Sequence, residues 1–291
     1  MDTALQLVLL TLAAGTPLVF AALGELVTEK SGVLNLGVEG MMLVGAVVAF
    51  ITAATTKSAW FGVLAGMLAG AALSLLFAVV TLSLQANQVA SGLALSLFGV
   101  GLSAFVGLEY VSVVIEPIKP VLGVSPLVVL SLVLFAAIQW FLFKTRAGLV
   151  LRAVGESPQS AHAIGYPVIR IRYLAVLFGG ACAGLGGAYL SLVYNPSWTE
   201  GMTAGRGWIA LALVVFATWK PWRVLAGAYL FGGVTLAQFQ AQALGVEIPA
   251  QYLSMLPYVA TIVVLAIISR DAATIKLNAP ASLGRAFHPE G

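Results

Sequence analysis

The chain contains 291 residues, of which 60% are hydrophobic and 9% are charged, and its mean hydropathy is +1.03. These values exclude an ordinary soluble enzyme and are typical of an integral membrane protein, because a water-exposed surface of this size needs far more charge. The formal net charge of +3 comes from basic residues scattered over short loops, which favours an effect of membrane topology over nucleic-acid binding.

Apolar stretches follow one another along almost the whole chain. A helix needs roughly 20 mostly apolar residues to cross a hydrocarbon core about 30 Å thick. On this basis the sequence predicts an all-α, polytopic bundle of eight or nine transmembrane helices in a lipid bilayer. The stretch at 207–219 is short enough to be broken or to pair with the next one. The predicted spans cover residues 4–23, 33–54, 59–84, 88–107, 125–143, 172–193, 207–219, 222–243 and 252–269.

A polar interruption at residues 31–42 breaks the apolar sequence after the first span, with three glycines, Asn35 and Glu39. One interpretation is a broken helix, since irregular backbone at membrane depth is tolerated where protein or a water-filled cavity covers it. Its freed backbone groups, together with Asn35, would then be able to bond a polar solute. The other interpretation is an ordinary interfacial loop in which Glu39 faces lipid headgroups, and the spacing does not decide between them.

Two further polar groups lie at or near the ends of spans, where polar side chains are candidates for a permeation path because they are costly at membrane depth. Asn87 and Gln88 fit either a binding element or a simple loop with a helix cap. Gln238 and Gln242 are four residues apart and share a helix face, which makes them weak pore-lining candidates.

Another polar group, around Thr203 and Arg206, follows the sixth span. Trp198 and Trp208 flank it and fit the aromatic belt that membrane proteins place at the lipid interface. Arg206 stands between two glycines, and we expect it to gate the outer mouth of the path or to anchor a docking partner.

Small residues recur at four-residue spacing in two of the predicted spans. Such stripes let helix backbones approach closely where lipid gives no hydrophobic drive for association. We expect them to serve internal packing, and packing of a second membrane subunit is the alternative. The stripes are Gly62, Gly66 and Gly70, and Gly180, Gly184 and Ala188.

One polar insert, residues 144–172, separates the fifth and sixth spans. Ser157 suits an N-cap, Pro158 the first helical position and Gly165 the position after the last turn, which predicts a two-turn helix at 158–164. So short a helix needs packing to stay formed. We interpret it as a docking helix for a motor protein, with a solvated loop as the alternative.

The basic residues predict the orientation. If the insert is cytoplasmic, eleven of the 14 Lys and Arg residues lie on its side of the membrane, which is the bias that orients membrane proteins. The N-terminus is then outside and the C-terminus inside. The expected organisation is one transmembrane domain, residues 1–270, which contains the insert, and a cytoplasmic tail, residues 271–291.

No residue pattern for catalysis or metal binding stands out. The one cysteine, Cys182, lies within a span, and the two histidines are far apart and lack ligand-type neighbours. The glycine-rich stretch 179–187 lacks the ending of a phosphate-binding loop. We therefore expect a transport subunit without a cofactor of its own, not an enzyme. A secondary transporter driven by an ion gradient would need ionisable residues deep within several spans, and only Glu39 is a plausible one.

Four blocks of sequence, 31–42, 87–92, 153–158 and 202–211, carry a family resemblance when taken together and in this order. They resemble the membrane permease subunits of ABC importers in the branched-chain amino acid and simple-sugar permease superfamily. Within it, they are most similar to the nucleoside permeases. The resemblance extends from about residue 12 to residue 270.

This resemblance implies an assembly in the bacterial plasma (inner) membrane. Its members would be a second, related permease in a heterodimer, a cytoplasmic ABC ATPase that carries ATP and Mg, and an extracytoplasmic substrate-binding lipoprotein. The 156–165 region would then be the coupling helix, which sits in a groove of the ATPase. The coupling residues implied are Gly155, Glu156, Ser157, Pro158, Ala161 and Gly165.

The ending of the 31–42 block is similar to nucleoside permeases, so a nucleoside is favoured over a simple sugar or a branched-chain amino acid. The chain departs from relatives at Ser157, where Asn is common, and at Trp208, where Phe is common, and Trp208 would change the shape of the path. The predicted substrate-path residues are Asn35, Glu39, Asn87, Gln88, Thr203, Arg206, Trp208 and Gln238.

Overall fold

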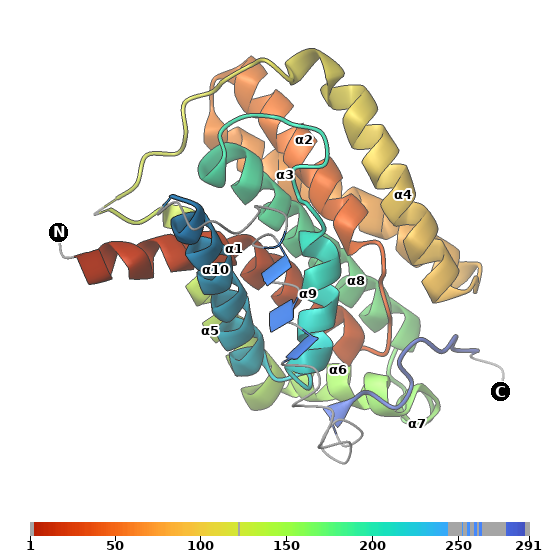
Figure 1. Ribbon diagram of the computed structural model, residues 1–291. Coiled ribbons are helices and arrows are strands. Elements are labelled where there is room, and N and C mark those ends of the chain that lie inside the picture. Colours follow the sequence, from red (N-terminus) through yellow and green to blue (C-terminus); the bar gives the residue numbers. More distant parts are fainter. Residues whose placement is uncertain are drawn as a thin grey trace.

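The computed structural model describes residues 3–121, 123–243, several positions between 252 and 263, and residues 278–288. Its regular secondary structure is helical apart from two isolated β-bridges, so the predicted all-α bundle is confirmed (Figure 1). The helices are α1 (Thr3–Lys30), α2 (Val38–Thr56), α3 (Ala59–Ala78), α4 (Gln88–Gly107), α5 (Pro126–Lys144), α6 (Arg146–Glu156), α7 (Pro158–Ala163), α8 (Val168–Tyr189), α9 (Arg206–Phe216) and α10 (Pro221–Ala243). Single π-helical turns extend α3 (Val79–Ser83) and α8 (Leu190–Tyr194), and a 3-10 turn extends α4 (Leu108–Tyr110).

Seven helices in the described part of the chain are long and apolar enough to cross a membrane, namely α1, α2, α3, α4, α5, α8 and α10. Helix α9 has 11 residues, in line with the short stretch expected there. The predicted span at 252–269 lies largely outside the described residues. The prediction that the first span ends at residue 23 is wrong, because Glu25 and Glu29 are buried within α1, which continues to Lys30.

Helices α2, α3 and α8 form the most closely packed part of the bundle, and glycines line their contacts. A Cβ atom added to Gly66 of α3 would lie 2.7 Å from the carbonyl oxygen of Gly45 on α2. A Cβ atom added to Gly45 would lie 2.5 Å from the Cα atom of Gly184 on α8. The predicted stripes on α3 and α8 face each other directly, because a Cβ atom added to Gly184 would lie 2.2 Å from the carbonyl oxygen of Gly66. The expected internal packing is confirmed.

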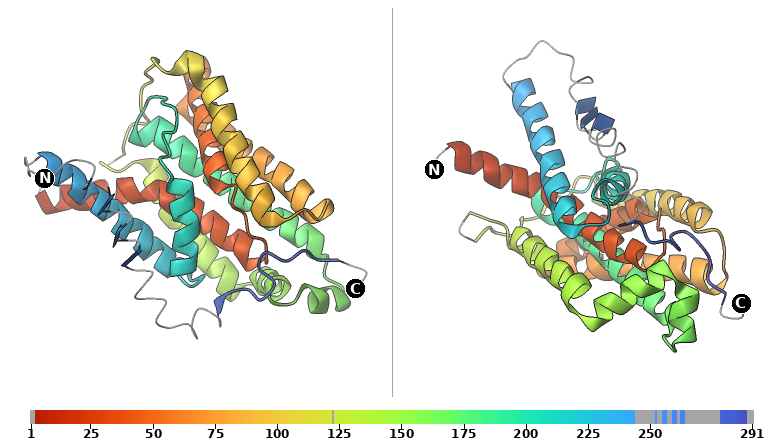
Figure 2. Two further views of the ribbon diagram at one scale, coloured as in Figure 1. Left: turned by 45° about the vertical axis from the view of Figure 1, so that its right-hand side comes forward. Right: turned by 90° about the horizontal axis from the view of Figure 1, so that it is seen from below.

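The other helices surround α1, which packs against α8, α10, α9 and α5, whereas α4 packs mainly against α2. Figures 1 and 2 place α6, α7 and residues 278–288 together at one end of the bundle. The extended segment 111–125, which joins α4 to α5, lies away from that end (Figure 1). The insert and the described C-terminal residues thus belong to the same face of the molecule.

We expect Gly184→Ala to lower the melting temperature of the purified protein in detergent, because its Cβ would overlap the backbone of α3. Overpacking of this kind costs about 1–3 kcal/mol. The matched control is Gly101→Ala on α4, where nothing lies within 4 Å of an added Cβ atom. Equal melting temperatures for the two variants would contradict the close approach of α3 and α8.

Candidate functional site

The segment between α1 and α2 is non-helical, and the protein covers it. Ser31, Val33 and Asn35 are fully buried, and regular helix resumes at Val38. The prediction of a broken helix is confirmed for residues 31–37, whereas residues 38–42 already belong to α2. The alternative of an interfacial loop is wrong, because an exposed loop would leave these residues in contact with lipid headgroups or water.

The hydrogen-bonding groups of this segment are paired within the protein, as buried backbone requires. The backbone N–H of Asn35 donates to Glu25 Oε1 at 3.1 Å, and the side-chain oxygen Asn35 Oδ1 accepts the backbone N–H of Gly37 at 2.9 Å. Gln88 Oε1 accepts the N–H of Leu34 at 2.8 Å. Ser96 Oγ donates to the carbonyl oxygen of Leu36 at 2.7 Å. Side chains of α1 and α4 thus hold the break in place.

Glu39, in the first turn of α2, joins this segment to α9. Its carboxylate accepts hydrogen bonds from Thr203 Oγ1 at 2.5 Å, from the Gly205 amide at 3.0 Å and from the Gly207 amide at 2.6 Å. The N-terminus of a helix carries unpaired N–H groups and partial positive charge, both of which favour a carboxylate. Glu39 is 6% exposed, so it caps α9 from a neighbouring helix and does not face headgroups.

Arg206 and Trp208 follow on the first turn of α9. Arg206 donates from one guanidinium nitrogen to the carbonyl oxygens of Met202 and Thr203, at 3.4 and 3.2 Å, and lies over the ring of Tyr194. Trp208 is 39% exposed. The structure therefore brings the predicted residues Glu39, Thr203 and Arg206 into one cluster, with Trp208 at its edge.

Trp198 is buried and does not belong to an aromatic belt, so this prediction is wrong. It packs against Ala46, Val47 and Phe50 of α2, and Gly107 at the end of α4 makes room for its indole ring. The reason lies in the path of residues 195–205, which fold back over α2 and carry Trp198 into the core.

The remaining path candidates are spread over other parts of the bundle. Asn87 is exposed and caps α4 through a 3.0 Å bond from the Ala90 amide, as the simple capping alternative supposes. Gln88 is buried beside the broken segment. Gln238 is buried on α10, which packs chiefly against α1, and Gln242 is exposed.

Sequence reasoning missed three buried ionisable residues, so the expectation that Glu39 is the only such residue deep in the bundle is wrong. Glu25 and Glu29 stand four residues apart on one face of α1, and Arg172 lies in the first turns of α8 with 1% exposure. Glu29 Oε2 accepts the indole N–H of Trp219. One signal in the sequence could have revealed them: Glu25 and Glu29 are four residues apart in a largely apolar helix, so they share one face of it.

The insert contains two helices. Helix α7 begins after Ser157, whose Oγ accepts the Ser160 amide at 3.3 Å, and Gly165 follows it with a φ of +93°. The predicted two-turn helix is confirmed. Helix α6 was not predicted, because its apolar residues, such as Leu151 and Val154, are interspersed with two arginines and a glutamate in a segment too short to span a membrane. Ala161 of α7 packs in a cluster with Val154, Val168 and Phe287, so the short helix is held on several sides.

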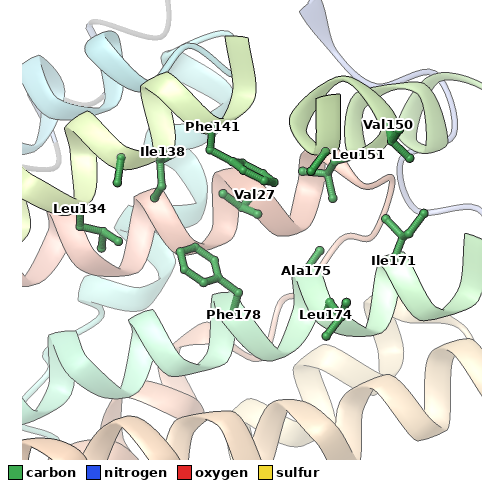
Figure 3. A pocket seen from close by; sticks show the side chains of 12 residues that line it. Val27, Leu134, Ile138, Phe141, Val150, Leu151, Ile171, Leu174, Ala175 and Phe178 are labelled. Atoms are coloured by element: carbon green, nitrogen blue, oxygen red, sulfur yellow. The ribbon is translucent and has the colours of Figure 1, made fainter. Parts of the chain in front are cut away.

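An apolar cavity of about 540 Å³ lies between α1, α5, α6 and α8 (Figure 3). Figure 3 shows Phe141, Phe178 and Leu151 turned toward it, and its lining is formed by hydrocarbon side chains. A polar solute needs hydrogen-bonding groups in its site. This cavity therefore does not fit a permeation path, and the polar cluster around Glu39 remains the candidate.

A bundle of membrane-length helices with a covered polar break and a short helix at one end is the architecture expected of a membrane transport subunit. The comparison with protein families is specific: the model of the branched-chain amino acid transport system permease component matches residues 7–265. The chain belongs to this family.

Curated relatives cover nearly all of the chain. A putative glucose ABC transporter permease of Haloferax volcanii is 40% identical over 96% of both chains. A nucleoside ABC transporter permease of Lactococcus lactis is 35% identical over 87% of this chain and 88% of its own. A guanosine ABC transporter permease of Bacillus subtilis is 34% identical over 88% and 89%. No solved structure matches the chain.

We expect Glu39→Gln to destabilise the protein by about 2 kcal/mol, because the amide group of Gln must turn an N–H toward at least one of the three donors. The measurement is the melting temperature in detergent. Glu200→Gln is the matched control, since Glu200 is exposed in the loop that precedes α9. A similar melting temperature for both variants would argue against the capping role of Glu39.

Proposed function

We propose that this chain is a permease subunit of an ATP-driven ABC importer and forms part of the translocation path for a nucleoside-like solute in the cell membrane. The observation that carries the proposal is helix α7, packed firmly at one end of the bundle in a chain that belongs to a transport permease family. Membership of this family implies a separate ATPase and a substrate-binding protein as partners.

Helix α7 and the residues around it suit a contact with the ATPase. The side chain of Glu156, which precedes the helix, is exposed. Ile164 and Tyr166, in the turn that follows, are 72% and 39% exposed. Apolar side chains at the tip of a polar insert favour a protein partner over water. ATP and Mg would be held by that partner, and this chain would receive its movement through α7.

The orientation follows from the same assignment. If α7 meets a cytoplasmic ATPase, the end of the bundle that carries α6, α7 and residues 278–288 is cytoplasmic. The N-terminus of α1 then lies outside. The orientation predicted from the sequence agrees with this assignment, because the predicted spans put eleven of the 14 Lys and Arg residues on the side of the insert.

The solute path is proposed to run beside the Glu39 cluster. Glu39 and Asn35 form hydrogen bonds with other groups of the protein, so we assign them the role of positioning α9 and the broken segment. Trp208, at the edge of this cluster, is partly exposed, and we propose that a nucleobase stacks on its ring. Arg206 stands two residues before Trp208. Contact of Asn87, Gln88 and Gln238 with solute stays a prediction.

A nucleoside is the solute that we favour, supported by the two relatives whose names state nucleoside and guanosine. A simple sugar is the second candidate, favoured by the Haloferax volcanii relative named for glucose. The complete importer would also contain an extracytoplasmic binding lipoprotein, which presents the solute, and a second related permease, which completes the membrane core as a heterodimer.

We expect Glu156→Arg to reduce the amount of solute transported per ATP hydrolysed without lowering the melting temperature, since this exposed side chain lies at the proposed ATPase contact. Loss of an interfacial charge contact changes affinity by roughly tenfold or more. The control is Glu109→Arg, an exposed acid at the end of α4 away from α7. Unchanged coupling in Glu156→Arg would count against the docking role of α7.

The energy source and solute are tested together in proteoliposomes that contain the complete importer. We expect uptake of labelled guanosine that requires ATP and persists when the proton gradient is collapsed. Glucose in roughly tenfold excess should not inhibit this uptake, since that excess would reveal a glucose affinity within about a factor of ten of that for guanosine. Displacement by glucose would favour the sugar alternative. Uptake that survives removal of the ATPase subunit but stops with the gradient would favour an ion-driven transporter.

A further inference from the structure

Residues 278–288, here called the C-terminal strap, cross the α7 end of the bundle and bond to several elements. The Gly284 amide donates to the carbonyl oxygen of Gly32 at 3.2 Å, which ties the strap to the broken segment. Lys30 Nζ donates to the carbonyl oxygen of Asn278 at 2.8 Å. Gln88 Nε2 reaches the carbonyl oxygen of Arg285 at 3.5 Å. Figure 2 shows the strap lying between α7 and the end of α1.

The strap also holds the joint between α6 and α7. Ser282 donates twice to the carbonyl oxygen of Gly155, from its amide at 3.0 Å and from its Oγ at 2.6 Å. Farther along, Phe287 is buried against Val154 and Ala161 and meets the ring of His162 edge-on, with ring centres 5.6 Å apart. The strap therefore contacts α7, the proposed coupling helix, along one face and bonds to the end of α6 just before it.

Arg172 connects these two sets of contacts. Its buried guanidinium donates from Nε to the carbonyl oxygen of Ser31 at 3.1 Å and from one terminal nitrogen to Ser282 Oγ at 3.0 Å. The other terminal nitrogen donates to the carbonyl oxygen of Arg285 at 3.2 Å. A guanidinium removed from water is costly unless its N–H groups are bonded, so the broken segment, strap and α8 are fixed relative to one another.

We infer that the C-terminal strap transmits movement of α7 to the broken segment, with Ser282 and Arg172 as positioning residues. The continuous path of contacts runs from Gly155 through Ser282 and Arg172 to Ser31. From there the backbone leads to Glu39, which holds the N-terminus of α9. Movement of the coupling helix thereby reaches the candidate solute path through hydrogen bonds between buried groups. This inference rests on the proposed function of α7.

A chain of contacts shows where coupling can pass, and a functional measurement must show that it does. The test uses the complete importer in proteoliposomes and measures guanosine transported per ATP hydrolysed. For Ser282→Ala we expect this ratio to fall by roughly tenfold, the effect of losing a hydrogen bond to a charged group, while ATP hydrolysis stays within about twofold of the parent. Ala281→Ser, at the exposed neighbouring position, is the matched control and keeps the parent ratio.

Phe287→Ala provides an independent second variant, since it removes the apolar contact between the strap and α7 and leaves the hydrogen bonds of Arg172 in place. We expect the same fall in ratio, with Arg285→Ala as its control because the Arg285 side chain is exposed. A purely structural role would lower transport and hydrolysis in proportion, and an unchanged ratio in Ser282→Ala and Phe287→Ala would overturn the inference. If Glu156→Arg lowers the ratio while both strap variants leave it unchanged, coupling at α7 stands and the strap has no part in it.

Discussion

Backbone groups that leave a helix inside a membrane protein must find partners in the protein itself, because lipid supplies none. The break between α1 and α2 meets this requirement through side chains from three other parts of the bundle. Glu25 comes from α1, Gln88 and Ser96 from α4, and Arg172 from α8. Each partner is buried or nearly so, which means that the break can exist only while these helices keep their places. The irregular segment therefore determines how α1, α4 and α8 are arranged around it.

Two kinds of contact hold the bundle together: close backbone contacts through glycines, and hydrogen bonds between polar groups. Helices α2, α3 and α8 meet through glycines, so that their backbones touch and form a rigid block. Helix α9 is too short to be held in that way along a full span, and its N-terminus is fixed by the carboxylate of Glu39. Glu39 belongs to α2, so the rigid block positions α9 directly. Polar contacts thus place the shorter helix α9 against a close-packed framework.

The features that the sequence predicted well depend on local physics. The two-turn helix of the insert follows from Ser157, Pro158 and Gly165, whose effects act within a few residues. The glycine stripes followed from helical spacing alone. The burial of Glu29 and Trp198 was missed because each depends on a partner far away in the chain, Trp219 for Glu29 and the end of α4 for Trp198.

The candidate site shows the same division. Glu39 and Thr203 were both recognised as unusual polar residues, yet their direct hydrogen bond joins positions 164 residues apart and no local pattern announces it. Asn87 and Gln88 are adjacent and looked alike, but one caps a helix in an exposed position and the other bonds to buried backbone. The difference in burial between Asn87 and Gln88 depends on which face of α4 packs against α2.

Helix α7 has only six residues, fewer than an isolated helix needs in water. Its shape is consequently a property of its surroundings: Val154 from one side, Val168 from another and Phe287 from a third. A synthetic peptide that copies the insert would not reproduce this shape and would be a poor mimic of the intact surface. Any binder selected against α7 should accordingly be raised against the folded protein, in which α6, α8 and the C-terminal strap impose the conformation that a partner would recognise.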